Sequence, residues 1–231
     1  MTFEPAPYSM TNDNIILLLL IFNLVGISYV LIMNGASIIE RAKCIFYYEN
    51  KSTPYNDRTH ITKICNSLMD FQTIFYATIV TTGIIDEHRF NITQENSIPV
   101  LGTLAAIFIV YLLIKRGLYY IVNNILFHKG ASEEWDSFYL FATKLWGFTL
   151  TPAALAILFL PELPLKYVEI YSILTLAAYL FTLIRGASKI IFAKKCIYVD
   201  IFLYLCALVF LPMAMVWKTI LQLSDFITIK I

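Results

Sequence analysis

Six apolar segments separated by short polar loops run through almost the whole chain. An apolar run of about 20 residues crosses the hydrocarbon core of a bilayer as a helix, because a helix satisfies its own backbone hydrogen bonds where no water is present. We therefore expect an all-α membrane protein with six transmembrane helices. In chain order, the expected spans are residues 15–33, 67–85, 98–114, 137–160, 169–184 and 197–216.

The composition agrees with this interpretation. Of the 231 residues, 59% are hydrophobic and 14% are charged, whereas a soluble domain carries about 25% charged residues. Six helices of about 20 residues take up roughly half of the chain and leave no room for a soluble domain of the usual size. Residues 1–231 are therefore expected to form a single polytopic membrane domain.

The basic residues predict the orientation in the membrane. Twelve lysines and arginines lie in the loops after the first, third and fifth spans, four lie on the opposite side, and Lys144 lies inside a span. Basic residues accumulate in cytoplasmic loops of membrane proteins. The N-terminus and the C-terminus are therefore both expected outside the cytoplasm.

Three spans end in similar sequences, which raises the question of an internal repeat. They are Leu-Ile-Met-Asn-Gly at 31–35, Leu-Ile-Lys-Arg-Gly at 113–117 and Leu-Ile-Arg-Gly at 183–186. The similarity suggests three helical hairpins, formed by residues 15–85, 98–160 and 168–216. The alternative is that basic and small residues are simply common at cytoplasmic helix ends.

Beyond two of these sequences, apolar residues recur at helical spacing. Residues 38–46 and 118–126 place apolar side chains at steps of three and four. This pattern predicts short amphipathic cytoplasmic helices that lie in the membrane interface or cap the bundle from the cytoplasmic side. Solvated extensions of the spans explain the pattern of residues 38–46 equally well.

Lys144 is the most unusual residue of the predicted spans. A charge in the bilayer interior costs about 2.5–3.5 kcal/mol on insertion scales, unless it pairs with another group or extends toward the interface. Lys144 shares a helix face with Asp136, Leu140, Gly147 and Thr151, which follow one another along the helix at steps of three and four residues. A face that mixes charged, small and hydroxyl residues is typical of a seam between helices.

Two carboxylates are candidate partners for Lys144. Asp70 lies about one turn into the second span and Asp200 one turn into the sixth, both from the cytoplasmic side. Acids are also common in the first turn of a helix, so both residues are alternatively exposed helix-start carboxylates. The candidates for a polar seam are Asp70, Asp136, Lys144, Thr151 and Asp200. Pro152 and Pro212 each remove a backbone donor inside a span and are expected to kink it.

The sequence contains no recognisable catalytic or metal-binding constellation. His60, His88 and His128 are isolated and fall on different sides of the predicted membrane. No glycine-rich phosphate loop and no nucleophile elbow is present. The sequence therefore does not indicate an enzyme, and it predicts no cofactor, no metal site and no nucleic-acid partner.

Two motifs resemble a known family. They are Phe-Ala-Thr-Lys-Leu-Trp-Gly at 141–147, followed by Pro152, and Ile-Phe-Leu-Tyr-Leu-Cys-Ala-Leu at 201–208, which ends on Leu-Pro at 211–212. They resemble small integral membrane proteins from Bacteroidota that carry a domain of unknown function, over roughly residues 115–221. The resemblance implies a bacterial inner (cytoplasmic) membrane location and marks Lys144, Pro152 and Pro212 as family features. It implies no activity and no cofactor.

Two functions follow from these patterns. The outer loops are short, whereas the cytoplasmic face is larger, basic and partly amphipathic, which favours a non-enzymatic partner or assembly factor. Such a protein would contact the lipid bilayer and either another membrane protein or a second copy of itself. The alternative is a small solute or ion-coupled transporter that uses the polar seam around Asp70 and Lys144. A solvent-lined cavity that reaches this pair would favour transport.

Overall fold

The computed structural model describes residues 14–46, 60–89, 94–126, 129–160 and 164–190 and, near the C-terminus, residues 212, 214–219 and 222. In these parts of the chain, all regular secondary structure is helical. The helices are α1 (Asn14–Phe46), α2 (His60–Arg89), α3 (Gln94–Leu126), α4 (Lys129–Thr149), α5 (Thr151–Phe159) and α6 (Leu165–Ile190). Residues 214–219 are also helical.

Five segments are long and apolar enough to cross a membrane, judged by length and composition. They are Asn14–Glu40, Ile64–Ile85, Ile98–Tyr119, Trp135–Phe159 and Leu165–Ala187. This finding confirms the expectation of an all-helical, multi-pass membrane protein for the first five predicted spans. The sixth span, which forms the second half of the third hairpin, falls largely outside the described residues, so the count of six spans and the three hairpins stay predictions.

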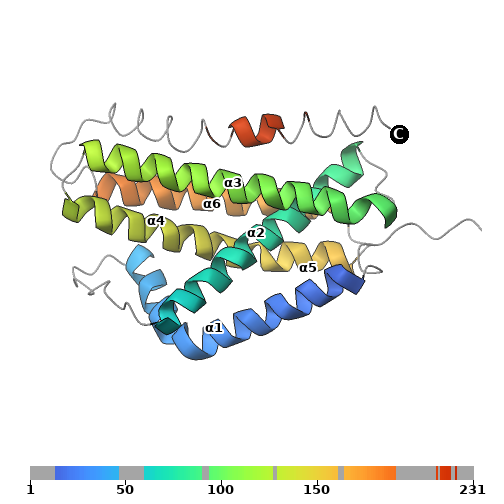
Figure 1. The fold of residues 1–231 in the computed structure, drawn as a ribbon, viewed down its shortest axis with the longest axis horizontal. Coiled ribbons are helices and arrows are strands. Elements are labelled where there is room, and N and C mark those ends of the chain that lie inside the picture. The colour runs from blue at the N-terminus through green and yellow to red at the C-terminus, as the bar shows by residue number, and fades with distance from the viewer. Residues whose placement is uncertain are drawn as a thin grey trace, which may run out of the picture.

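The amphipathic segments do not form separate helices. Residues 38–46 continue α1, which bends toward its C-terminal end (Figure 1), and residues 118–126 continue α3. For residues 118–126 the prediction of a separate helix was wrong, and for residues 38–46 the alternative, an extension of the span, is what the structure shows, because neither Gly35 nor Gly117 ends a helix here. No glycine among the described residues has a positive φ, the conformation that usually terminates a helix.

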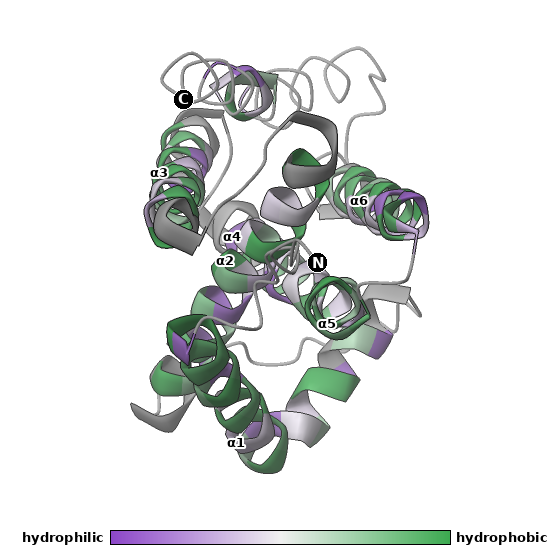
Figure 2. Ribbon diagram, turned by 90° about the vertical axis from the view of Figure 1, so that its right-hand side faces the viewer, coloured by the Kyte–Doolittle hydropathy of each residue, from purple (hydrophilic) through white to green (hydrophobic). Residues whose placement is uncertain are grey.

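Helix α2 is the centre of the bundle. It runs diagonally between α1 on one side and α3, α4 and α6 on the other (Figure 1), and it contacts all five of the other named helices. In its membrane segment 56% of residues are buried, against 22% for α1 and 17% for α3 and α6. Figure 2 shows apolar residues on several sides of α1, as expected for a helix that meets both protein and lipid.

Glycines set the closest approaches between helices. A Cβ atom added to Gly147 of α4 would lie 2.7 Å from the Cα atom of Thr73 in α2. A Cβ atom at Gly83 of α2 would lie 2.9 Å from Ile157 of α5. Only a residue without a side chain permits such contacts, which is how small residues allow membrane helices to pack closely.

The helix interruption between α4 and α5 precedes Pro152. Leu150 separates the two helices and keeps a helical φ of −77° and ψ of −13°. Pro152 has no N–H group to donate, so the hydrogen-bond ladder is broken at this point. The hydroxyl of Tyr171 in α6 donates to the carbonyl oxygen of Thr149 at 2.9 Å and satisfies one acceptor at the break. Pro212 is helical, but residues 211 and 213 on either side of it lie outside the described residues.

Candidate functional site

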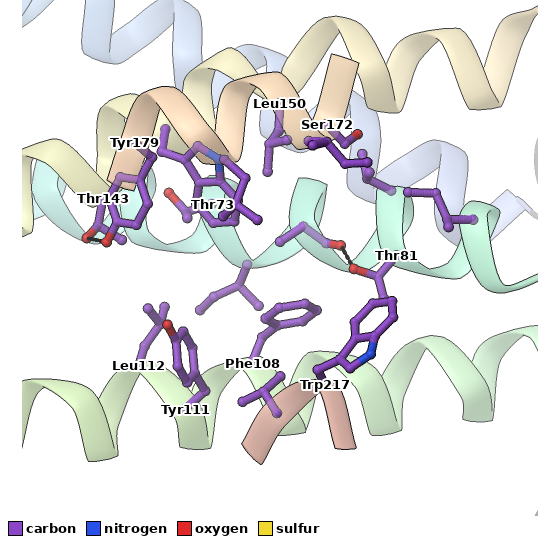
Figure 3. A pocket seen from close by; sticks show the side chains of 18 of the residues that line it. Thr73, Thr81, Phe108, Tyr111, Leu112, Thr143, Leu150, Ser172, Tyr179 and Trp217 are labelled. Atoms are coloured by element: carbon purple, nitrogen blue, oxygen red, sulfur yellow. Dashed lines mark hydrogen bonds between the residues drawn. The ribbon is translucent and has the colours of Figure 1, made fainter. Parts of the chain in front are cut away.

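A cavity of about 280 Å³ lies between α2, α3, α4 and α6, and the C-terminal residues Val216 and Trp217 also line it. In Figure 3, three side chains of α3 point across the cavity toward α2, namely those of Phe108, Tyr111 and Leu112. Small-molecule pockets in proteins typically measure about 300–1,000 Å³, so this cavity has room for a small or slender ligand. Most of its wall is apolar, formed by Ile74, Ala77, Val80, Ile84, Phe108, Leu112, Trp146, Leu150, Ile173, Leu176 and Leu180.

Several hydroxyl groups in the wall bond to their own helices. The hydroxyl of Thr73 donates to the Met69 carbonyl oxygen at 2.9 Å, that of Thr81 to Ala77 at 2.7 Å, and that of Ser172 to Val168 at 2.7 Å. A hydroxyl that donates to the carbonyl four residues earlier has no hydrogen left for a ligand. These side chains therefore add few donors to the cavity.

Lys115 of α3 is the cation of the described cavity wall. Its side chain is buried, with the residue 1% exposed. Its Nζ atom lies 3.2 Å from the hydroxyl of Tyr111 and 3.4 Å from that of Tyr179. It also lies 5.2–5.4 Å from the ring centroids of Tyr111, Tyr139 and Tyr179. Three tyrosines from α3, α4 and α6 thus form an aromatic cage around one ammonium group.

The hydrogen bonds around this cage have a defined direction. Lysine only donates, so the Tyr179 oxygen accepts from Lys115. The hydroxyl of Thr143 donates to the Tyr139 carbonyl oxygen at 3.0 Å, so in the 3.0 Å contact between Tyr179 and Thr143 the tyrosine is the donor. The chain of donors therefore runs from Lys115 through Tyr179 to Thr143 and ends on the backbone.

The two ends of the cavity differ. Thr143, Tyr179 and Lys115 form a buried end, whereas Trp217 lies at the opposite end in Figure 3. Among the described lining residues only Ile173 and Trp217 are exposed, at 58% and 59%. Ile173 and Trp217 are therefore the described lining residues beside which the cavity can reach the outside of the bundle.

The only carboxylate of the described wall is far from the lysine. Glu169 and Tyr179 of α6 lie about 15 Å apart along the helix axis, at a rise of 1.5 Å per residue. Glu169 also has an interaction of its own in the structure. General acid–base pairs must both reach the reacting atoms within about 3 Å, directly or through one water. Lys115 and Glu169 therefore do not form such a pair in this structure.

The structure brings two of the seam candidates together. Lys144 of α4 is 6% exposed, and its Nζ atom lies 3.0 Å from Asn66 Oδ1 and 3.6 Å from Asp70 Oδ1 of α2. Asn66 was not among the sequence candidates. The Asp70 side chain is half-exposed, at 49%. The pair does not line the cavity, although Thr143 and Thr73 beside it do.

The other seam candidates lie elsewhere. Thr151 at the start of α5 accepts a hydrogen bond from Gln72 Nε2 at 3.5 Å. Asp136 is half-buried near the start of α4 and has an interaction partner of its own. Asp200 falls outside the described residues. In the described ranges, no three His, Cys, Asp or Glu side chains gather closely enough to hold a metal ion.

Sequence reasoning missed Lys115. The prediction ended the third span at residue 114 and counted Lys115 as a loop residue, whereas α3 continues to Leu126 and buries this side chain. One signal was available, because Tyr111 and Tyr119 lie one helical turn before and after Lys115 on the same face. Tyr139 and Tyr179 come from other helices, and their spacing in the sequence contains no hint of the cage.

Comparison with known protein families gives a match over residues 14–220, to a family described as a domain of unknown function, DUF4271. No curated protein and no solved structure matches the chain. The matched region contains all six named helices, together with the Lys144–Asp70 pair and the cavity. Because the match covers most of the 231 residues, this membrane protein belongs to the DUF4271 family.

Proposed function

We propose that the protein is a non-enzymatic membrane protein that binds a lipophilic molecule in the cavity between α2, α3, α4 and α6. The observation that carries this proposal is an apolar cavity inside the bundle, among whose described lining residues only Ile173 and Trp217 are exposed. Protein interiors are normally packed without voids of this size. An apolar ligand from the bilayer reaches such a site without crossing water.

The wall disfavours a polar solute. A polar molecule that enters the cavity loses its hydrogen bonds to water, which costs about 1–3 kcal/mol of binding free energy for each polar group left unpaired. The hydroxyl groups of Thr73, Thr81 and Ser172 donate to their own helices and do not replace these bonds. A hydrocarbon chain has no such need, and it gains dispersion contacts with the aliphatic and aromatic wall.

An ion-coupled transporter is the second candidate, supported by the contact between Lys144 and Asp70. Ionisable residues inside membrane segments are rare and often functional. The cavity stops short of the pair, because Thr143 and Thr73 line it while Lys144 and Asp70 do not. Transport would therefore need a second conformation that joins the cavity to the pair.

A role as a partner or assembly factor in a bacterial inner membrane is compatible with ligand binding. A lipid-binding protein of this kind would present its ligand to another membrane protein. Copurification from native membranes tests this part of the proposal, because it predicts a stoichiometric partner that remains bound through two orthogonal purification steps. Recovery of the chain alone would contradict it.

Photo-crosslinking tests the cavity itself. A long-chain alcohol that carries a diazirine at mid-chain is expected to label peptides of α2, α3 and α6 in the purified full-length protein. Ala77 of α2 is buried and lines the cavity, so Ala77→Phe should fill the space and reduce labelling about tenfold or more, which corresponds to about 1.4 kcal/mol.

The control places the same ring outside the bundle. Ala106 of α3 is exposed, so Ala106→Phe should label like the parent protein. Leu180→Trp narrows the cavity from α6 and provides a second variant if Ala77→Phe does not fold. Unchanged labelling in a folded cavity-filling variant would contradict the proposed function.

A further inference from the structure

We infer that the cavity selects a single-chain lipid with a compact anionic head, a carboxylate or a phosphate, and that this head pairs with Lys115. The inference rests on the proposed function, because it specifies the ligand of the same cavity. It goes further by assigning the ligand a charge, an orientation and a residue that recognises it.

The first argument is the environment of Lys115. This side chain lies within the membrane segment Ile98–Tyr119 and is 1% exposed. The described residues surround its Nζ atom with two hydroxyl groups and three tyrosine rings, but they place no carboxylate in contact with it. Ring faces attract a cation without neutralising it. A buried charge of this kind is normally paired, so the site lacks an anion.

The second argument is the set of free donors. An ammonium group has three N–H donors, and Tyr111 and Tyr179 accept two of them. The Tyr111 oxygen accepts from Lys115, so its own hydrogen is available. Lys115 and Tyr111 both line the cavity. One N–H and one O–H are therefore available to two oxygen atoms of a single carboxylate or phosphate, and such charge-assisted hydrogen bonds are the stronger kind.

The third argument is the shape of the site. Lys115 lies at the buried end of the cavity. A ligand head group that reaches it must therefore be compact and must lose its hydration water. The volume of about 280 Å³ suits one hydrocarbon chain. The tail would follow the apolar wall and leave the bundle between Ile173 and Trp217. Glu169 in the same wall disfavours the reversed orientation, because a carboxylate repels an anion.

Matched ligands test the inference on the purified full-length protein. The probes are hexadecanoic acid and hexadecanol, each with the same mid-chain diazirine, and the readout is the affinity from crosslinking titrations. The parent protein is expected to bind the acid at least tenfold more tightly than the alcohol. Lys115→Met keeps the unbranched stem but removes the charge, so it should lose the preference for the acid and bind both probes with similar affinity. Arg116→Met removes an exposed charge from the next position and should keep the preference.

The outcomes separate the inference from the proposed function. If the parent protein binds acid and alcohol equally, the inference is wrong while the proposed function stands. If neither probe binds, both fail. Hexadecyl phosphate should compete as well as the acid, whereas competition by sodium acetate or inorganic phosphate alone would indicate a site for free anions and overturn the inference. Tyr111→Phe keeps the ring, removes one donor and should weaken the preference for the acid even if Lys115→Met does not fold.

Discussion

Two lysines of the described part of the chain are buried inside the bundle, and their surroundings differ. Lys144 contacts the Asp70 carboxylate and the Asn66 amide oxygen. Lys115 contacts tyrosine hydroxyls and rings. The first arrangement is a polar contact between α2 and α4 that stabilises the fold. The second leaves a charge that a ligand can neutralise. The type of neighbour, rather than depth in the membrane, thus distinguishes a structural lysine from a candidate binding residue.

Lys144→Met is expected to destabilise the detergent-solubilised protein. The change leaves Asp70 without this cation and Asn66 without its donor. We expect the free energy of unfolding to fall by about 1–3 kcal/mol. The loss is smaller than for a fully buried ion pair, because Asp70 is half-exposed. The double variant Lys144→Met/Asp70→Asn should lose less than Lys144→Met alone. Unfolding curves in detergent measure both. A Lys144→Met variant as stable as the parent would show that the lysine only extends toward the interface.

Helix packing depends on positions where a single methyl group has no space. Gly147→Ala is expected to push α4 away from Thr73 of α2, and overpacking of this kind costs about 1–3 kcal/mol. Gly102 of α3 has no neighbouring atom within 4 Å of an added Cβ. Gly102→Ala should therefore be neutral or stabilise the protein by up to about 1 kcal/mol, because alanine is the better helix former. Equal melting temperatures for the two variants would contradict the close approach of α2 and α4.

The helices themselves were largely predictable from sequence, whereas their contacts were not. Hydropathy identifies a span because each residue partitions into lipid almost independently of its neighbours. The contact of Lys144 with Asp70 was also among the expectations, since Lys144 lies on a helix face typical of a seam and Asp70 lies about one turn into the second span. The cage around Lys115 was not, because Tyr111, Tyr139 and Tyr179 come from three helices. Which faces of three helices meet is a property of the packed bundle, and hydropathy contains no information about it.

For the whole molecule, the sidedness of the termini stays a prediction. Lys115 is now placed inside the bundle, but the remaining basic residues still favour the loops after the first, third and fifth spans. Single cysteines at Ser9 and Ser224, both outside the described residues, should react with an impermeant maleimide in intact spheroplasts. The native Cys44, as the sole cysteine, should react only after lysis. Protection of either terminus would overturn the predicted orientation.

The central position of α2 has a consequence for biosynthesis. Four of the five helices that α2 contacts are synthesised after it. Gln72 is 3% exposed in the finished bundle, and in the nascent chain its amide would face lipid. We therefore expect α2 to stay beside the insertion machinery until α4 and α5 arrive. Ribosome-stalled chains that end shortly after α2 should crosslink to the insertase from position 72. Chains that extend past α6 should not form this crosslink. Loss of the crosslink in chains that end before α4 would contradict this order.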